Sequence, residues 1–418
     1  MNIARLSLAL ALCGFLAPAA VQAQAVAAPA QQLTAAERQA LRPLHEAYRQ
    51  RNWAGVAAAL PAASAAVQSP FGRYVVGQIR YEMGLYTQNA EAVSAGTEAM
   101  LASGAAPAPT ARALLSNQVA LALRNGAPDR AEQLMARIVE ANPGDPLALA
   151  QLGEIKLRLA SDLRRGGNQQ QRTARAREGL AFYERALQAA GASATLPESF
   201  YRRAAAVTFD ASAPSAVTAG QMLVTRYPSA TNWRDVLLQY RDLNPNNPEL
   251  ALDVGRLLAR TQSLAGEDDY LDLARSLITA GRAMEASALL TQGTQRGMVS
   301  ASEPASRDLI AQATRAAAAE RSGLAARRTQ ARSAATGTAA RQVADSLWGQ
   351  EQWAEAAEFY RLALEKGGED AGLLNTRLGA ALALAGQRPE GETVLRGVAG
   401  PYQGLAGYWL IHLAQRPA

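Results

Sequence analysis

The chain has 418 residues, of which 49% are hydrophobic, 6% aromatic and 19% charged, with a formal net charge of +6. This balance excludes a disordered or membrane-embedded polypeptide. Alanine, the residue with the highest helix propensity, is abundant and aromatic residues are sparse, so we expect an all-α fold. One cysteine and two histidines exclude a Cys/His zinc site, a thiol–imidazole pair and a disulfide framework.

The amino terminus has the layout of a secretory signal peptide. Arg5 supplies a positive charge, and the apolar stretch over residues 6–16 is shorter than the roughly twenty residues that span a bilayer. Small residues suited to cleavage precede residue 24, and cleavage there removes the only cysteine, Cys13. We therefore expect a signal peptide over 1–23, a flexible tail over 24–32, and a mature periplasmic protein without a transmembrane anchor.

From residue 33 the sequence predicts helices of roughly 12 to 16 residues, separated by short breaks that contain Gly, Pro, Asn or Asp. In each of several helix pairs, an apolar stripe on the first helix is followed by a turn and by a second helix whose small residues permit close packing. The residues that carry this pattern are Tyr270, Leu273, Ala274, Leu277, Gly281, Ala286, Trp353, Ala356, Tyr360, Ala363, Leu378, Gly379, Ala131, Pro143, Leu152 and Gly153.

These spacings resemble those of tetratricopeptide repeats, and the chain resembles secreted bacterial members of that superfamily. The repeats are degenerate: Gly368 stands where a terminal proline is usual, and Lys156 stands where an aromatic residue is usual. The resemblance implies a right-handed α-solenoid of stacked helical hairpins with an inner groove. It also implies that the groove binds another polypeptide.

We expect three regions in the mature chain. Tetratricopeptide-like repeats cover residues 33–300, and an Ala/Arg-rich segment over 301–337 forms either a helix or a hinge. Further repeats with an apolar terminal helix cover residues 338–418. That terminal helix either closes the last repeat or joins two copies of the chain.

The sequence shows no catalytic, cofactor-binding or metal-binding motif, so we expect a protein that is not an enzyme. The spacing of Asp242 and Asp253 resembles a calcium loop, but Asn247 occupies the position that requires glycine, which favours a helix cap instead. Glu198 and Ser199 resemble the catalytic pair of lytic transglycosylases, although the companion motif of that family is missing. A first-turn acid is the simpler interpretation of Glu198.

Two basic segments are candidates for contact with a partner, because guanidinium groups bind carboxylates and phosphates in bidentate fashion. The same arginines also suit an ordinary solvated face. The candidate residues are Arg164, Arg165, Arg172, Arg175 and Arg177, in what we expect to be a loop, and Arg327, Arg328 and Arg332 in the Ala/Arg-rich segment. Nucleic acid is not expected as a partner, because no groove-reading element is visible.

The sequence thus predicts a periplasmic tetratricopeptide-like adaptor or scaffold for protein–protein interaction in cell-envelope assembly, trafficking or polymer export. One alternative is direct binding of an anionic envelope polymer by the two basic segments. Another is an unrecognised periplasmic glycan hydrolase that uses Glu198. The tryptophans are expected to pack between helices, with any one of them a candidate groove contact: Trp53, Trp233, Trp348, Trp353 and Trp409.

Overall fold

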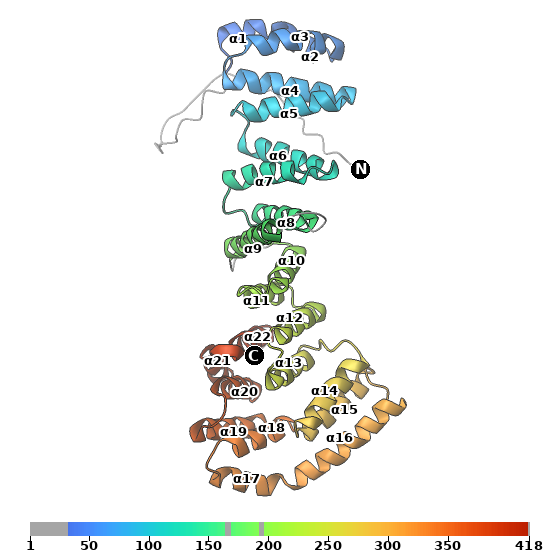
Figure 1. The fold of residues 1–418 in the computed structure, drawn as a ribbon, viewed down its shortest axis with the longest axis vertical. Helices are drawn as coiled ribbons and strands as arrows, with labels where there is room; N and C mark the ends of the chain where they lie inside the picture. The colour runs from blue at the N-terminus through green and yellow to red at the C-terminus, as the bar shows by residue number, and fades with distance from the viewer. Residues whose placement is uncertain (1–31, 164–168, 192–195, 417–418) are drawn as a thin grey trace, which may run out of the picture. The chain divides into compact units, whose positions relative to one another are not determined.

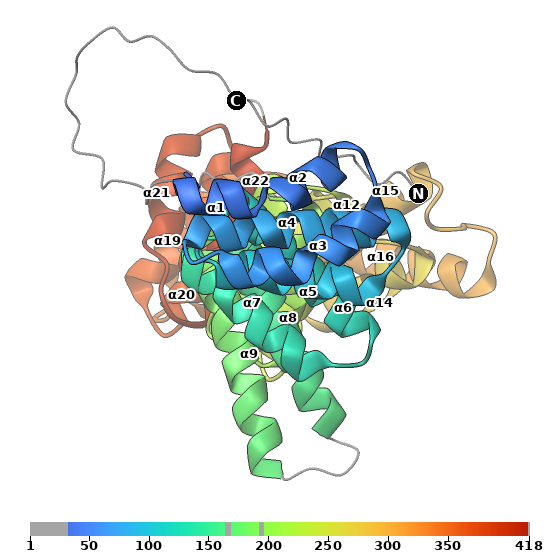
Figure 2. The ribbon, with the colours of Figure 1, turned by 90° about the horizontal axis from the view of Figure 1, so that it is seen from above.

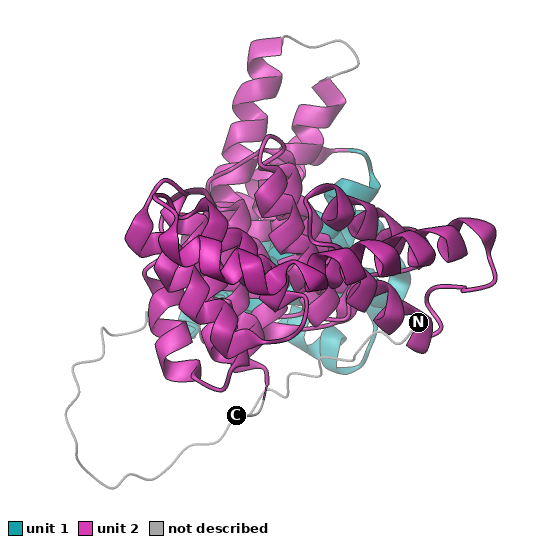
Figure 3. Ribbon diagram, turned by 90° about the horizontal axis from the view of Figure 1, so that it is seen from below, with its two compact units in different colours: residues 1–126 teal, residues 127–418 magenta. Residues whose placement is uncertain are grey.

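The computed structural model describes residues 32–163, 169–191 and 196–416, which form two compact units, Met1–Gly126 and Ala127–Ala418 (Figure 3). The expected signal peptide lies outside the described residues, as do Arg164 and Arg165. The described part contains 22 α-helices and the short 3-10 helix η2, with no strand, which confirms the all-α prediction. None of its helices has both the length and the apolar character needed to cross a membrane.

The first unit is a series of antiparallel helices, four of which start at a side-chain cap. Thr34 and Glu37 form a capping box, and Asn52, Ser69 and Asn89 each accept a backbone N–H at the start of a helix. The helices are α1 (Ala35–Ala40), α2 (Arg42–Arg49), α3 (Trp53–Ala66), α4 (Pro70–Thr87), α5 (Ala90–Ala102) and α6 (Ala108–Arg124).

Glu37 also ties α1 to the turn between α3 and α4. Its carboxylate accepts the backbone N–H groups of Gln68 at 2.9 Å and Ser69 at 2.7 Å, besides that of Thr34 at 3.0 Å. The hydrogen bonds from Ser69 and Thr34 lower the pKa of Glu37 to about 2. A buried carboxylate is thereby held ionised at the start of the unit.

The tightest hairpin of the first unit joins α4 to α5 through glycines. A Cβ atom on Gly96 would lie 2.5 Å from the backbone nitrogen of Tyr81, and one on Gly77 would lie 2.9 Å from that of Met100. Only residues without a side chain permit backbones to approach this closely. The small residues of this region therefore fix the packing of the hairpin.

The second unit continues the same architecture, with antiparallel pairs such as α8 and α9, α14 and α15, α18 and α19, and α20 and α21 (Figures 1 and 2). The structure thus confirms the tetratricopeptide-like solenoid of stacked helical hairpins. Its elements are α7 (Pro128–Ala141), α8 (Pro146–Asp162), α9 (Gln169–Ala190), α10 (Glu198–Asp210), α11 (Ala216–Arg226), α12 (Ala230–Asp242), α13 (Pro248–Arg260), α14 (Glu267–Thr279), α15 (Ala283–Gln295), α16 (Pro304–Ser322), α17 (Leu324–Ser333), α18 (Thr338–Trp348), α19 (Trp353–Lys366), α20 (Ala371–Leu384), α21 (Arg388–Arg396), η2 (Gly400–Tyr402) and α22 (Gln403–Ala414).

The repeat-signature residues occupy the positions that a helical hairpin requires. Tyr270, Ala274 and Leu277 are buried on α14, and Gly281 makes the turn with a φ of +74°, a value that glycine adopts without strain. Ala286 on α15 is fully buried. The remaining members lie on helices in the same way, except Pro143, which follows α7: Leu273 on α14, Trp353, Ala356, Tyr360 and Ala363 on α19, Leu378 and Gly379 on α20, Ala131 on α7, and Leu152 and Gly153 on α8.

The two segments that depart from the repeat pattern are largely helical where described. Residues 169–177, expected as part of a loop, form the first turns of α9. Glutamine, arginine and alanine all have good helix propensity, which explains why this polar stretch extends the helix. In the Ala/Arg-rich segment, α16 ends at Ser322 and α17 at Ser333, and a short break precedes α18.

The terminal helix α22 returns to pack against α11 and α12, far back in the sequence (Figure 1). Trp233 of α12 makes edge contacts with Tyr408 and His412 at centroid distances of 6.0 and 6.3 Å. The Gln221 side chain donates to the Gly404 carbonyl at 3.1 Å, and Gln415 donates to that of Val224 at 2.7 Å. The helices α11 to α22 therefore close into what we call the helical ring.

Candidate binding surfaces and the charge network of the helical ring

Charged side chains from four of its helices meet inside the helical ring. Arg377 of α20 donates from Nε to both carboxylate oxygens of Asp253 on α13, at 2.9 and 3.0 Å, and from Nη1 to those of Asp345 on α18, at 3.2 and 3.1 Å. Arg256 pairs with Asp253 at 2.9 Å and with Glu285 of α15 at 2.7 Å. The full charge network comprises Glu249, Asp253, Arg256, Arg282, Glu285, Arg341, Asp345, Tyr360, Glu369 and Arg377.

The carboxylates and guanidinium groups of the charge network hold one another ionised. Burial alone would lower the pKa of Arg377, but Asp253 and Asp345 outweigh it and raise that pKa. Burial would likewise raise the pKa of Glu249, and the facing Arg377 and Arg282 instead lower it to about 2. Since each of these carboxylates and guanidinium groups meets an opposite charge within the chain, the charge network leaves little charge for a ligand, and the loss of one member would leave a buried charge without its partner.

The sequence pattern that resembled a calcium loop forms the start of α13 and contributes to the charge network. Asn247 caps α13, as predicted, by accepting the Leu250 N–H at 3.0 Å, and Pro248 is the first helical residue. Asp253 is turned to Arg377 and Arg256. Within the described residues, no group of three His, Cys, Asp or Glu side chains is arranged to hold a metal ion.

Sequence reasoning did not find the charge network, although one signal was present. Arg377 stands alone in a helix that is otherwise almost entirely apolar, and Asp345 stands between the buried Ala344 and Leu347. Charges on an apolar helix face are rarely buried unless they are paired. The partners could not be identified, because Arg377 and Asp253 are 124 residues apart.

The predicted basic residues that are described lie on two helices, α9 and α17, which are well separated within the second unit (Figure 1). Arg175 pairs with Glu132 at 2.6 Å, and Arg328 pairs with Glu355 at 2.6 Å. Arg332 lies over the Phe359 ring, with its guanidinium carbon 5.4 Å from the centroid. The other contacts are from Arg172 to Gln169 and from Arg327 to Ser346 and the Glu320 carbonyl, whereas Arg177 is exposed on α9. The structure thus does not bring these residues together.

The alternative catalytic residue, Glu198, lies in the first turn of α10, as the simpler interpretation predicted. Its carboxylate accepts a hydrogen bond from Asn232 Nδ2 at 2.9 Å. This contact joins the starts of α10 and α12. Glu198 therefore has an evident structural role as an acceptor between neighbouring helices.

In the first unit, a cavity of about 370 Å³ lies between α4, α5 and α6, and we call it the apolar groove. Leu85 and Leu121 on its walls are 52% and 37% exposed, which is high for large aliphatic side chains. Amide side chains stand beside them. The groove is lined by Tyr81, Gly84, Leu85, Gln88, Ala90, Val93, Ser94, Thr97, Leu114, Asn117, Gln118, Leu121 and Arg124.

In the second unit, a cleft of about 660 Å³ lies between α13, α14, α15 and the turn that joins α18 to α19. We call it the arginine cleft. The guanidinium carbon of Arg260 lies 4.7 Å from the Trp353 ring centroid, and that of Arg256 lies 4.6 Å from the Trp348 ring. The two tryptophans meet edge to face at 4.9 Å. Aromatic rings thus hold two guanidinium groups in place on one side of this cleft.

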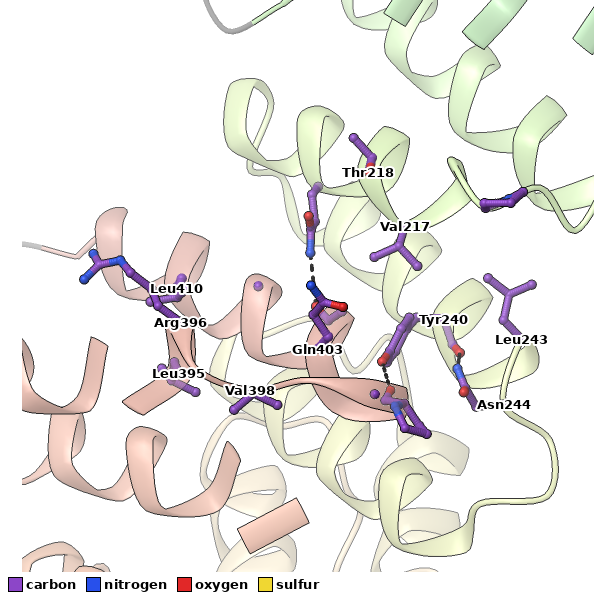
Figure 4. A pocket seen from close by; sticks show the side chains of 16 residues that line it. Val217, Thr218, Tyr240, Leu243, Asn244, Leu395, Arg396, Val398, Gln403 and Leu410 are labelled. Atoms are coloured by element: carbon purple, nitrogen blue, oxygen red, sulfur yellow. Dashed lines mark hydrogen bonds between the residues drawn. The ribbon is translucent and has the colours of Figure 1, made fainter. Parts of the chain in front are cut away.

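A further cleft, of about 630 Å³, lies where α21 and α22 meet α11 and α12 (Figure 4). The polar groups that line this cleft make hydrogen bonds to other residues of the chain. Gln221 donates to the Gly404 carbonyl, Tyr240 donates to the Pro401 carbonyl, and Asn244 donates to the Tyr240 carbonyl (Figure 4). This cleft therefore belongs to the closure of the helical ring.

No family model and no curated protein matches the chain. Among solved structures, the human IFIT1 dimer with PPP-AAAA is 15% identical, with 78% of this chain and 64% of that chain covered and a TM-score of 0.27. A tetratricopeptide repeat protein from Parabacteroides merdae is 11% identical, with coverage of 83% and 99% and a TM-score of 0.24. Yeast Tom70 is 9% identical, with coverage of 91% and 95% and a TM-score of 0.20. The fold assignment rests on the hairpins of the chain itself.

Proposed function

We propose that this chain is an adaptor that binds another polypeptide in the bacterial periplasm, in cell-envelope assembly, trafficking or polymer export. The observation that carries the proposal is the apolar groove of the first unit, where Leu85 and Leu121 are exposed beside a cavity of about 370 Å³. Exposed apolar surface next to a groove is typical of surfaces that bind a partner. The periplasmic location rests on the signal-peptide pattern of the first 23 residues.

The groove has the chemistry that a peptide requires. Leu85, Leu121 and Val93 offer apolar surface, and the amides of Asn117 and Gln118 also line the groove. An amide side chain can both donate to and accept from a peptide backbone, and the aliphatic residues can receive apolar side chains. A stack of helical hairpins presents such a groove on a rigid scaffold.

The anionic-polymer alternative has weaker support than the polypeptide. Among its candidate arginines, Arg175 and Arg328 are already neutralised by Glu132 and Glu355. A polymer would have to displace these carboxylates before it could pair with the arginines. We therefore propose a polypeptide as the partner.

Affinity capture from solubilised envelope at high salt tests the proposal. The immobilised chain should retain a discrete polypeptide, and L121R should lose it, because an arginine in the groove places an unpaired charge against apolar surface. A57R, on the exposed side of α3 and outside the groove, is the matched control and should retain the polypeptide. Equal capture by L121R and the unsubstituted chain, with helicity unchanged by circular dichroism, would refute the groove as the binding site.

A further inference from the structure

The arginine cleft contains a guanidinium whose charge is poorly balanced, in contrast to the charge network beside it. Arg260 is 25% exposed, and its single carboxylate partner among the described residues is Glu351, at 3.9 Å and itself 71% exposed. A distant ion pair with so exposed a carboxylate contributes little. Burial lowers the pKa of Arg260, with a further contribution from the neighbouring Arg416, whereas the pKa of Arg256 one turn earlier is raised.

The guanidinium of Arg260 lies 4.7 Å from the Trp353 ring centroid and makes no hydrogen bond to another described residue. A guanidinium held against an aromatic ring by a cation–π contact still has N–H groups that can meet a carboxylate. The ring also holds the side chain in one orientation, so little rotamer freedom remains to be lost on binding. Arg260 is therefore positioned to receive an anionic group.

A second cation and an unused donor line the same cleft. Arg321 of α16 is exposed and makes no ion pair within the part of the chain that the structure describes. Gln350 lines the cleft, and its buried Nε2 has no acceptor among the described residues. An unsatisfied buried donor is unfavourable, so a ligand that draws this amide outward would satisfy it. The cleft thus combines two under-neutralised arginines with a free amide.

We propose that the arginine cleft binds an acidic segment of a polypeptide, with a side-chain carboxylate paired to Arg260 and Arg321. This inference rests on the proposed function, for which it supplies a second binding surface and the chemistry of the partner. The wall formed by α15 presents Ser287, Gln292 and Gln295, whose neutral polar groups suit a peptide backbone. The volume of about 660 Å³ lies in the range typical of ligand pockets.

Fluorescence anisotropy with defined probes tests the inference on the full chain. The probe is a fluorescein-labelled, amidated hexapeptide of alternating Glu and Leu, and its twin carries Gln in place of Glu. We expect the Glu probe to bind at least about tenfold more tightly than the Gln twin, the difference that a charge-assisted hydrogen bond supplies. Equal affinity for the two probes would overturn the inference.

Three variants locate the effect in the cleft. R260Q should weaken binding of the Glu probe about tenfold, and E351Q should strengthen it several-fold by removing the competing carboxylate. R307Q removes an exposed arginine of α16 that pairs with its neighbour Asp308, and it should leave binding of the Glu probe unchanged. An R260Q variant that binds like the unsubstituted chain would refute the assignment of Arg260.

An oligogalacturonate of six units separates the two sources of carboxylate. If it binds through Arg260 and the Glu probe does not, the ligand is an acidic glycan and the peptide assignment is wrong. The outcome is independent of the groove experiment. If L121R abolishes capture while R260Q has no effect on binding of the Glu probe, only the inference about the arginine cleft fails. If L121R leaves capture unchanged while R260Q weakens binding of the Glu probe, the apolar groove is refuted as the binding site and the inference about the cleft stands.

Discussion

Arg377 shows how a charged side chain can be fully buried in a helical protein. Its guanidinium is shared among Asp253, Asp345 and Glu249, so every charge-bearing edge meets a carboxylate. Such pairing in the interior offsets the large cost of removing ions from water, but only while the set is complete. The stability of the helical ring should therefore depend sharply on single members of the charge network.

Replacement of Arg377 by methionine tests this dependence. R377M keeps much of the side-chain volume but leaves three carboxylates short of a counter-ion, so we expect a loss of about 3–5 kcal/mol in the free energy of unfolding. R275M removes an exposed arginine paired with Asp272 and should cost less than about 1 kcal/mol. Denaturant unfolding followed by tryptophan fluorescence measures both, and equal losses would contradict a structural role of the charge network.

His412 makes the helical ring sensitive to acid. It lies between Trp233 and Trp409 in the closure, and burial, with contributions from Arg416 and Arg260, lowers its pKa to about 4. The unfolded chain takes up this proton near the ordinary histidine pKa of about 6.5. Between these two pKa values the unfolded state binds more protons than the folded state. The free energy of unfolding therefore has its full value above pH 6.5 and falls as the pH drops toward 4.

This loss of stability in acid is large enough to measure. Between pH 7 and pH 5 the unsubstituted chain should lose about 2 kcal/mol in the free energy of unfolding of the second unit, and H412L should lose much less over the same interval. His45 titrates in the first unit and provides a control, because H45L should leave this loss unchanged. The prediction is wrong if H412L keeps the full pH dependence.

At the scale of elements, the hairpins were predictable and the closure was not. Periodic apolar residues with Gly281 and Ala286 identify the α14 and α15 pair without knowledge of the rest of the chain, because a hairpin is a local structure. The packing of α22 on α11 and α12 depends on residues such as Gln221 and Gly404, which are 183 positions apart. No local pattern encodes such a contact, so the terminal helix could only be identified as apolar.

The same distinction applies to the binding surfaces. The apolar groove and the arginine cleft each combine residues from at least three helices, and their exposure is set by what the neighbouring helices leave uncovered. Sequence reasoning selected arginines by their density, which favoured Arg175 and Arg328, and these are neutralised by facing glutamates. Arg260 stands in an ordinary helical stretch and gave no signal.

A substitution at Gly404 tests the closure as an element. A Cβ atom there would lie 2.5 Å from the Tyr240 ring, so G404A should displace α22 and destabilise the second unit by about 1–3 kcal/mol. Amide hydrogen exchange should accelerate in α11, α12 and α22. G397A, where the nearest atom would be 3.5 Å away, is the control. Indistinguishable exchange in the two variants would show that α22 does not close the ring.

For the whole molecule, the two units carry surfaces of different chemistry. The first unit offers apolar side chains and amides, and the second offers arginines and tryptophans beside a neutralised charge network. Two separate surfaces can hold two partners, or two parts of one partner, at the same time. Rigid helical hairpins keep each surface preformed, which lowers the entropic cost of binding.

Site-specific photo-crosslinking in living bacteria tests the central claim, polypeptide binding by the apolar groove, most directly. A photoreactive amino acid at Leu121 should yield a discrete adduct with one polypeptide, because that side chain is exposed on the groove wall. The same group at Ala57 should not form this adduct. An identical adduct pattern at both positions, or no polypeptide adduct at Leu121, would contradict the claim.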